Sequence, residues 1–104
     1  MIKKVKIITL DYDVEMVPRL ENESGNELYG WHQEYNQRIL ISEEYTEELQ
    51  VRAIWHEVCH GLFRQFGMET DDEEEICRAL GHMLPTLLRD NPELVKLTMG
   101  DAVP

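Results

Sequence analysis

Hydrophobic and polar residues alternate in much of the first half of the chain and follow a helical period in the second half. Residues 3–10 begin with such alternation and are rich in β-branched side chains, which predicts a strand. Residues 11–17 fit either a short helix or a second extended segment, and residues 21–26 form a polar turn. Residues 28–33 and 38–42 predict a β-hairpin with a four-residue connection.

A long amphipathic helix is predicted from Thr46 to about Phe66. Thr46 is a good N-cap, and the two glutamates after it suit the positive end of the helix dipole. Gly67 is suited to the left-handed position that follows the last turn. The apolar residues form one broad stripe, as is typical of a helix that buries one face.

A second helix is predicted to open in an acidic segment at residue 70 and to run to about Arg89. Pro85 lies inside it and is expected either to kink or to split it. Residues 93–99 add one or two further turns, and the last five residues are expected to fray. No linker divides residues 1–104, which we expect to form a single domain.

The composition narrows the classes of partner. Ten basic against 21 acidic residues give a net charge of −11, which argues against nucleic acid or an anionic membrane as a partner. No apolar stretch approaches the roughly 20 residues that span a bilayer, and Lys6 and Asp11 interrupt the only segment resembling a signal sequence. Two cysteines do not make a disulfide framework. We therefore expect a cytoplasmic protein; the oligomeric state stays open.

The run His56-Glu57-Val58-Cys59-His60 matches the H-E-x-x-H pattern of zinc metallopeptidases. On a helix, residues four apart share one face, so both imidazoles can reach one metal ion. Glu57, about 100° round the helix, can reach a water on that metal as general base. The histidines lie beside the apolar stripe, which suits the wall of a cleft. The alternative is a pair of surface histidines on a solvated face.

A catalytic zinc ion takes three protein ligands and keeps one position open, so a third ligand must come from elsewhere. The acidic start of the second helix is the expected source, packed antiparallel to the first. The inward stripe of that helix is taken as Ile76, Leu80, Leu84 and Leu87. With this phase Glu73 points inward and is the expected ligand, Glu74 is the second choice, and His82 lies roughly opposite the stripe. The alternative is that these acids only complement the helix dipole in solvent.

Other residues with reactive side chains have less definite expected roles. Cys59 and Cys77 lie on apolar faces and are expected to be small buried thiols, although two thiolates in a structural zinc site are an alternative. An oxyanion could be stabilised by one of four side chains, and the sequence does not choose among them: His32, Tyr29, Tyr35 and Tyr45.

Several segments carry a family resemblance: Tyr29-Gly30, Ile39-Leu40-Ile41, the run from Trp55 through the histidine motif to Gly61, Glu73-Glu74, and residues 88–92. With them the chain resembles small phage- and mobile-element-associated zincins related to ImmA/IrrE-type metallopeptidases. The resemblance spans about residues 28–95, and its most specific element is the histidine motif.

The resemblance implies an α+β fold, a minimal zincin-like domain with a small antiparallel or mixed sheet and with the motif helix packed against a second helix. Zinc would be held by His56, His60 and a glutamate of the second helix, with Glu57 as general base. An edge strand of such folds aligns an extended peptide by β-augmentation. The strand Arg38, Ile39, Leu40 and Ile41 is expected to take that role.

Two functions follow as hypotheses. The first is a zinc-dependent, gluzincin-like metallopeptidase that hydrolyses a protein or peptide substrate with a zinc-activated water. The second is a catalytically inactive module of the same fold that binds zinc for stability or presents a surface to a partner.

Overall fold

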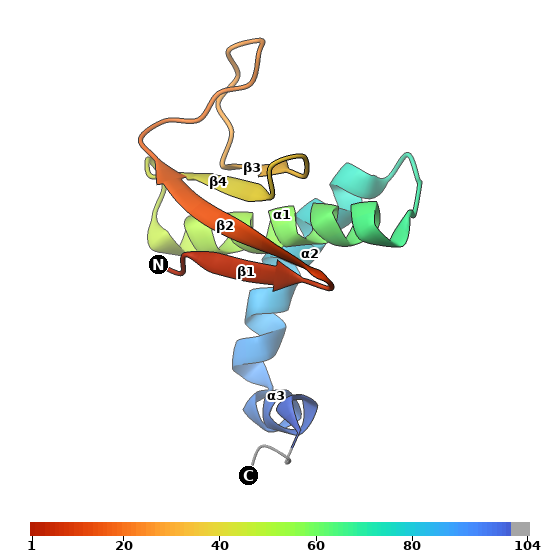
Figure 1. Cartoon of the computed structure of the whole chain (residues 1–104). Coiled ribbons are helices and arrows are strands. Elements are labelled where there is room, and N and C mark those ends of the chain that lie inside the picture. The colour runs from red at the N-terminus through yellow and green to blue at the C-terminus, as the bar shows by residue number, and fades with distance from the viewer. Residues whose placement is uncertain (101–104) are drawn as a thin grey trace.

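The computed structural model describes residues 1–100, which form a sheet and three helices (Figure 1). The strands are β1 (Lys4–Ile7), β2 (Leu10–Val17), β3 (Gly30–Gln33) and β4 (Arg38–Ser42). The helices are α1 (Glu47–Phe66), α2 (Glu73–Asp90) and α3 (Pro92–Met99). The expected α+β class is confirmed, residues 11–17 are extended, and Pro85 does not split α2. The expectation of fraying falls mainly on residues 101–104, which lie outside the described residues.

The four strands form one mixed sheet in the order β1-β2-β4-β3. β1 and β2 are an antiparallel hairpin, β3 and β4 are a second one with the predicted four-residue connection, and β2 pairs in parallel with β4. The predicted substrate strand, Arg38 to Ile41, lies in β4 and has a neighbour on both sides. A strand without a free edge cannot take up another strand, so that expectation is wrong. The edge strand on this side of the sheet is β3.

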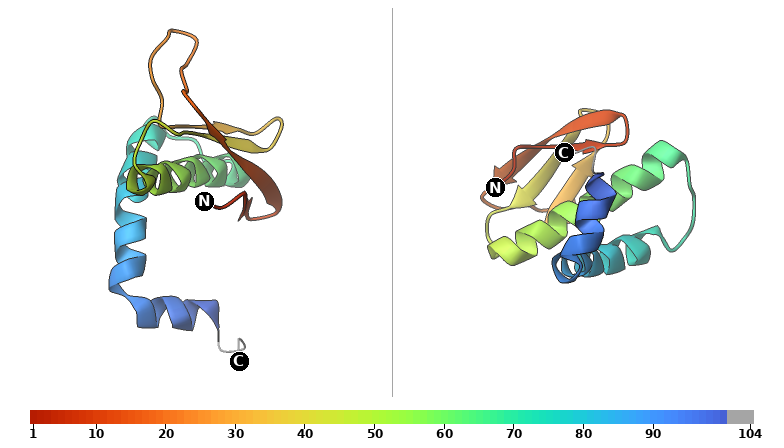
Figure 2. Two further views of the ribbon diagram at one scale, coloured as in Figure 1. Left: turned by 90° about the vertical axis from the view of Figure 1, so that its left-hand side faces the viewer. Right: turned by 90° about the horizontal axis from the view of Figure 1, so that it is seen from below.

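One face of the sheet packs on α1 (Figure 2). Alternate residues of a strand point to one face, and on the face toward α1 the buried side chains are Tyr12 and Val14 of β2 and Ile39 and Ile41 of β4. The main core consists of side chains less than a tenth exposed: Ile7, Tyr12, Val14, Ile39, Ile41, Ala53 and Ile54. This core fixes α1 across the sheet and so positions every side chain that α1 carries.

Both ends of α1 are formed as the sequence predicts. The Thr46 Oγ1 accepts a hydrogen bond from the backbone N–H of Leu49 at 3.4 Å, which satisfies one of the free N–H groups of the first turn. At the other end, Gly67 takes the left-handed conformation with φ 67°. The helix is therefore limited on both sides by its own sequence.

The first half of α2 packs against α1 around a second, smaller core. Its members are Cys59, Phe63 and Cys77, with Leu80 and Leu84 packed on them. Gly81 marks the closest approach, because a Cβ there would lie 3.0 Å from the backbone oxygen of Arg52 and 3.2 Å from the Cβ of His56. A larger residue would push α2 away from the histidine that opens the motif.

The second half of α2 leaves the body of the molecule and carries α3 at its end (Figures 1 and 2). Among the elements of residues 1–100, α3 contacts α2 alone. We call residues 86–99 the C-terminal arm. Its exposed apolar side chains are Leu87, Leu88, Leu94, Leu97 and Met99. Within the described residues, no helix combines the length and the apolar character needed to cross a membrane.

Candidate metal centre

The two motif histidines turn their ring nitrogens toward one point. His56 and His60 lie one turn apart on α1, and their Nε2 atoms are 3.1 Å apart. Both side chains are about four-fifths buried, at 22% and 20% exposure. Burial lowers the pKa of His56, while the carboxylate of Glu74 acts in the opposite direction. A neutral imidazole is the form that binds a metal ion, so burial favours ligation.

Glu74 of α2 completes a three-atom set with the two histidines. Its Oε1 lies 2.6 Å from His56 Nε2 and 3.5 Å from His60 Nε2. Ligand atoms of a tetrahedral zinc ion are about 3.4 Å apart, given bonds of about 2.0–2.1 Å. The three separations bracket that value, and the three side chains form a group able to hold a metal ion. The structure thus offers a metal ion the two histidines of the motif and one glutamate of α2.

Glu73, the expected third ligand, contacts the other ring nitrogen of His60. Its Oε2 lies 2.7 Å from Nδ1 of His60. A carboxylate at the second ring nitrogen of a metal-binding histidine fixes the tautomer and the orientation of the ring. The structure thus brings Glu74, the second choice from sequence, to the two Nε2 atoms and gives Glu73 a supporting position.

A second group of possible ligands shares His60 and adds Glu73 and Cys77. Burial raises the pKa of the Cys77 thiol to about 12, so a thiolate is strongly disfavoured there before any metal arrives. Cys59 and Cys77 are both free, buried thiols between α1 and α2, as expected. His82 belongs to neither group, although it lines the same cavity.

Glu57 is a buried acid beside the histidines, with only 8% of its surface exposed. Burial raises its pKa to about 7; Glu74 acts in the same direction, while His60 and a backbone hydrogen bond from His32 act against it. Gly30 of β3 permits this position, because a Cβ there would lie 3.2 Å from Cγ of Glu57. A carboxyl group with a pKa near 7 is suited to accepting and returning a proton.

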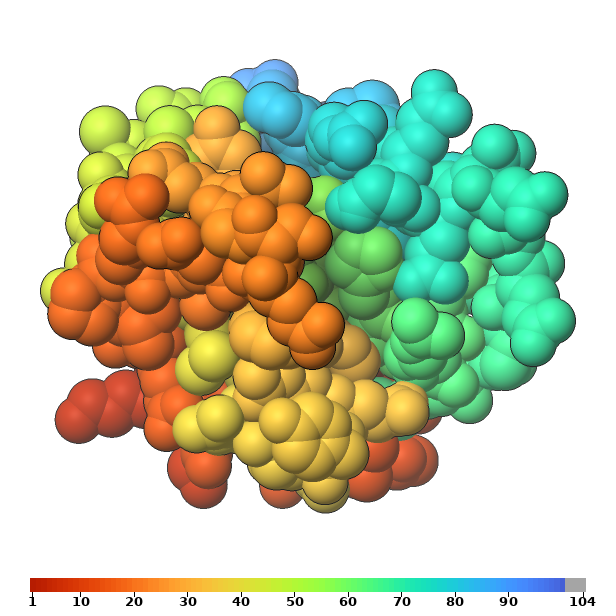
Figure 3. All heavy atoms as spheres, turned by 90° about the horizontal axis from the view of Figure 1, so that it is seen from above, coloured from red at the N-terminus to blue at the C-terminus, as the bar shows by residue number. Residues whose placement is uncertain are grey.

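The centre opens into a cavity of about 660 Å³. Its walls are the segment from Glu27 through β3, the exposed face of α1 and the first half of α2. Seen from above, α1 lies at the bottom of a hollow between the segment leading into β3 and the start of α2 (Figure 3). The two histidines, Glu57 and Glu74 all line this cavity.

The four possible oxyanion donors are separated by the fold. His32 and Tyr29 line the cavity, whereas Tyr35 and Tyr45 do not. His32 lies on the edge strand β3, where its Nε2 is 3.1 Å from the hydroxyl oxygen of Tyr12 and where burial lowers its pKa. The structure thereby reduces four possibilities to two.

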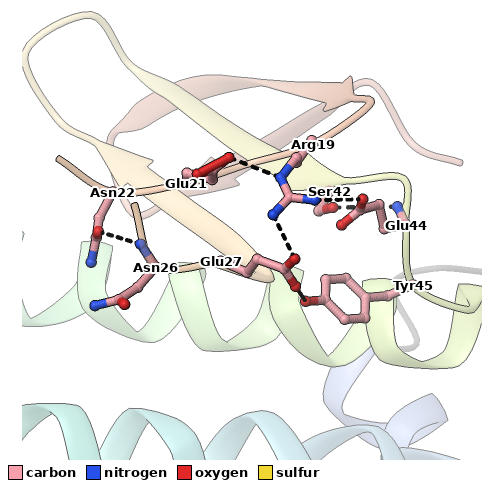
Figure 4. Close-up of polar contacts among 8 residues, drawn as sticks. All are labelled: Arg19, Glu21, Asn22, Asn26, Glu27, Ser42, Glu44 and Tyr45. Carbon is pink, nitrogen blue, oxygen red and sulfur yellow. Dashed lines mark hydrogen bonds and ion pairs between the residues drawn. The ribbon is translucent and has the colours of Figure 1, made fainter. Parts of the chain in front are cut away.

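The rim of the cavity above β3 is tied to the start of α1 (Figure 4). Arg19 makes ion pairs with three carboxylates, those of Glu21, Glu27 and Glu44, at 2.8, 2.7 and 3.5 Å. The Tyr45 hydroxyl donates to Glu27 at 3.3 Å, and the ring of Tyr45 packs on Tyr29 at 4.2 Å between centroids. These contacts hold the segment that enters β3 over the cavity.

Three arginines outside the histidine motif, which the sequence analysis did not predict as site residues, also line the cavity: Arg52, Arg64 and Arg78. Arg52 precedes His56 by four residues, Arg64 follows His60 by four, and Arg78 follows Glu74 by four. Each is therefore one helical turn from a candidate ligand and on the same face. That spacing was a usable signal in the sequence.

Comparisons of the chain with models of protein families, with curated proteins and with solved structures found no match. The resemblance to ImmA/IrrE-type metallopeptidases rests on the sequence motifs alone and stays a prediction.

Proposed function

We propose that this protein is a zinc-dependent metallopeptidase of the gluzincin type, related to the ImmA/IrrE-type enzymes. The observation that carries the proposal is the meeting of His56 Nε2, His60 Nε2 and Glu74 Oε1 beside the buried carboxyl of Glu57 in an open cavity. Three ligands leave a tetrahedral ion one free position, as a catalytic site needs.

The chain's own residues would divide the work as follows. A zinc ion held by these three ligands supplies Lewis acidity, which lowers the pKa of water toward 7 and polarises a carbonyl. Glu57 takes the proton of the attacking water and returns it to the leaving amide nitrogen, for which its pKa of about 7 is suited. Glu73 holds His60 in the tautomer that presents Nε2. The free edge of β3 offers backbone groups to an extended peptide.

The peptidase proposal is tested by metal content and by cleavage of a fluorogenic peptide library. Zinc-loaded wild type should cut peptides, and Glu57→Gln should keep zinc while losing at least 99% of the rate. Glu47→Gln is the matched control, because Glu47 is an exposed acid in the first turn of the same helix. If the zinc-loaded wild type cuts no peptide, the chain is instead the metal-binding module without activity.

The ligand set is tested by zinc affinity. Glu74→Gln should lose most of the zinc, since it removes a direct ligand, whereas Glu73→Gln should weaken affinity by about 10–100-fold, as supporting residues do. The reverse order would restore Glu73 as the ligand. Equal and undiminished zinc in both variants would mean that the third ligand lies elsewhere.

A further inference from the structure

Basic side chains are scarce in this chain but gather in its cavity. Of ten lysines and arginines, three line the cavity, and all three are arginines from α1 and α2. Arginine binds carboxylates through two parallel N–H donors, so it is the residue type expected where a carboxylate is recognised. The position of these three arginines therefore suggests that the cavity binds a ligand with carboxylate groups.

The charges of these arginines are only partly used within the protein. Arg52 makes one exposed ion pair with Glu48, at 3.3 Å. Within residues 1–100, no carboxylate lies within ion-pair distance of Arg64 or Arg78. Exposed ion pairs such as Arg52–Glu48 contribute little to stability, so Arg52 can exchange Glu48 for another carboxylate at small cost in free energy.

The acids that line the same cavity are mostly occupied. Glu57 and Glu74 belong to the metal centre, and Glu27 is paired with Arg19 at 2.7 Å. Glu34 is the remaining acid of the lining. Away from the metal centre, Arg64 and Arg78, which have no ion-pair partner within residues 1–100, and Arg52, whose pair with Glu48 is exposed, line the cavity with one remaining glutamate. The cavity therefore favours an anionic ligand, although the chain as a whole is acidic.

The arginines also have a defined spacing along the cavity. Arg52 and Arg64 are 12 residues apart on α1, which is about 18 Å along the helix axis. Measured along the helix axis, the midpoint between His56 and His60 is therefore about 9 Å from the position of each of these two arginines. An extended peptide advances about 3.3 Å per residue, so 9 Å corresponds to two or three residues on either side of the metal. Arg78 projects into the same cavity from α2.

The edge strand β3 runs along α1 in the direction from Arg52 toward Arg64. Gly30 lies against Glu57, and two residues later His32 lies against Gly61, one turn further along α1. A peptide paired with β3 would thus run along the row from Arg52 to Arg64. We propose, building on the peptidase function above, that the cavity selects peptides with acidic side chains two or three residues from the scissile bond on both sides.

Binding of labelled peptides to the zinc-loaded, full-length Glu57→Gln variant tests this selection without hydrolysis. Three eight-residue peptides, identical except for Glu, Gln or Lys at those positions, are compared by fluorescence polarisation. The Glu peptide should bind at least tenfold more tightly than the Gln peptide, and the Lys peptide should bind most weakly. Arg64→Gln and Arg78→Gln, added to this variant, should each weaken binding of the Glu peptide about fivefold or more. Arg89→Gln is the matched control and should leave it unchanged, because Arg89 does not line the cavity.

Charge reversal sharpens the test, since Arg64→Glu should make the Lys peptide bind better than the Glu peptide. The proposal is overturned if the Glu peptides do not bind, if Glu and Gln peptides bind equally, or if Arg89→Gln weakens binding as much as the other two. Failure of the peptidase function has a separate readout, because it appears as absent cleavage by the wild type.

Discussion

The buried carboxyl of Glu57 should make the stability of the metal-free chain depend on pH. Its pKa rises from the ordinary 4.5 to about 7 in the folded protein, mainly through burial. At about 1.4 kcal/mol per pKa unit, this rise corresponds to about 3 kcal/mol. Replacing Glu57 by Gln removes the ionisable group and keeps its shape, so the two chains should differ in how their stability responds to pH.

The sign follows from which state holds the proton. Between pH 4.5 and 7 the folded chain keeps a proton on Glu57 that the unfolded chain has released. The stabilisation is fully present below pH 4.5 and is lost as the pH rises through 7. Histidines act in the opposite sense: burial lowers the pKa values of His32 and His56, so they reduce stability as the pH falls below about 6.5.

The measurement is urea unfolding of wild type and Glu57→Gln in EDTA, from pH 5.5 to 8, followed by tryptophan fluorescence. Subtracting the free energy of unfolding of the variant from that of the wild type at each pH cancels the contribution of the histidines. Over this interval the wild type should lose about 2 kcal/mol relative to the variant. Glu47→Gln, at an exposed position, should run parallel to the wild type. A difference between wild type and Glu57→Gln that stays constant with pH would refute a buried, ionisable Glu57.

Three further predictions concern packing. Gly81→Ala should weaken zinc binding about tenfold in a titration, because the added Cβ would push α2 away from His56. Gly67→Ala is the control: its positive φ should lower the free energy of unfolding by about 1 kcal/mol and leave zinc affinity unchanged. Equal zinc affinities of the two variants would contradict the close packing at Gly81. The two thiols, Cys59 and Cys77, should react with Ellman's reagent only on unfolding, since burial raises the pKa of both; a fast reaction of the native chain would contradict this. Removing residues 92–104 should shift the melting temperature by no more than a few degrees in circular dichroism, because α3 contacts α2 alone among the described elements; a large drop would show that the arm supports the body.

Most local elements were predictable from the sequence, but the turn at Ile8 and Thr9, inside the strand predicted over residues 3–10, was not. The phase of α2 was not predictable either. Of the predicted inward stripe, Leu80 and Leu84 do pack on the second core, but Ile76 and Leu87 are 38% and 54% exposed. The buried positions of α2 are instead Cys77, Gly81 and Pro85, which are rotated by one residue. Small residues mark a close helix contact without adding hydrophobicity, so a pattern of large apolar side chains misses them.

That rotation also explains why Glu74 lies closer than Glu73 to the Nε2 atoms of the two histidines. Glu74 precedes Gly81 by seven residues, two turns on the same face, so the contact of Gly81 with His56 brings Glu74 to the Nε2 atoms. The order of the strands was also not predictable from local sequence patterns. β4 becomes an inner strand through parallel pairing with β2, and no local pattern reports a pairing between segments more than 20 residues apart.

The exposed apolar side chains of the C-terminal arm should make association between copies of this protein depend on ionic strength. Its leucines are exposed on a chain that carries a net charge of −11. Repulsion between copies extends about 10 Å at 0.1 M salt but only about 3 Å at 1 M, whereas apolar attraction acts at contact. In dilute buffer the charge keeps the arms of different molecules apart, and in molar salt they can meet. We therefore expect the protein to associate more strongly in molar salt than in dilute buffer, which light scattering would measure.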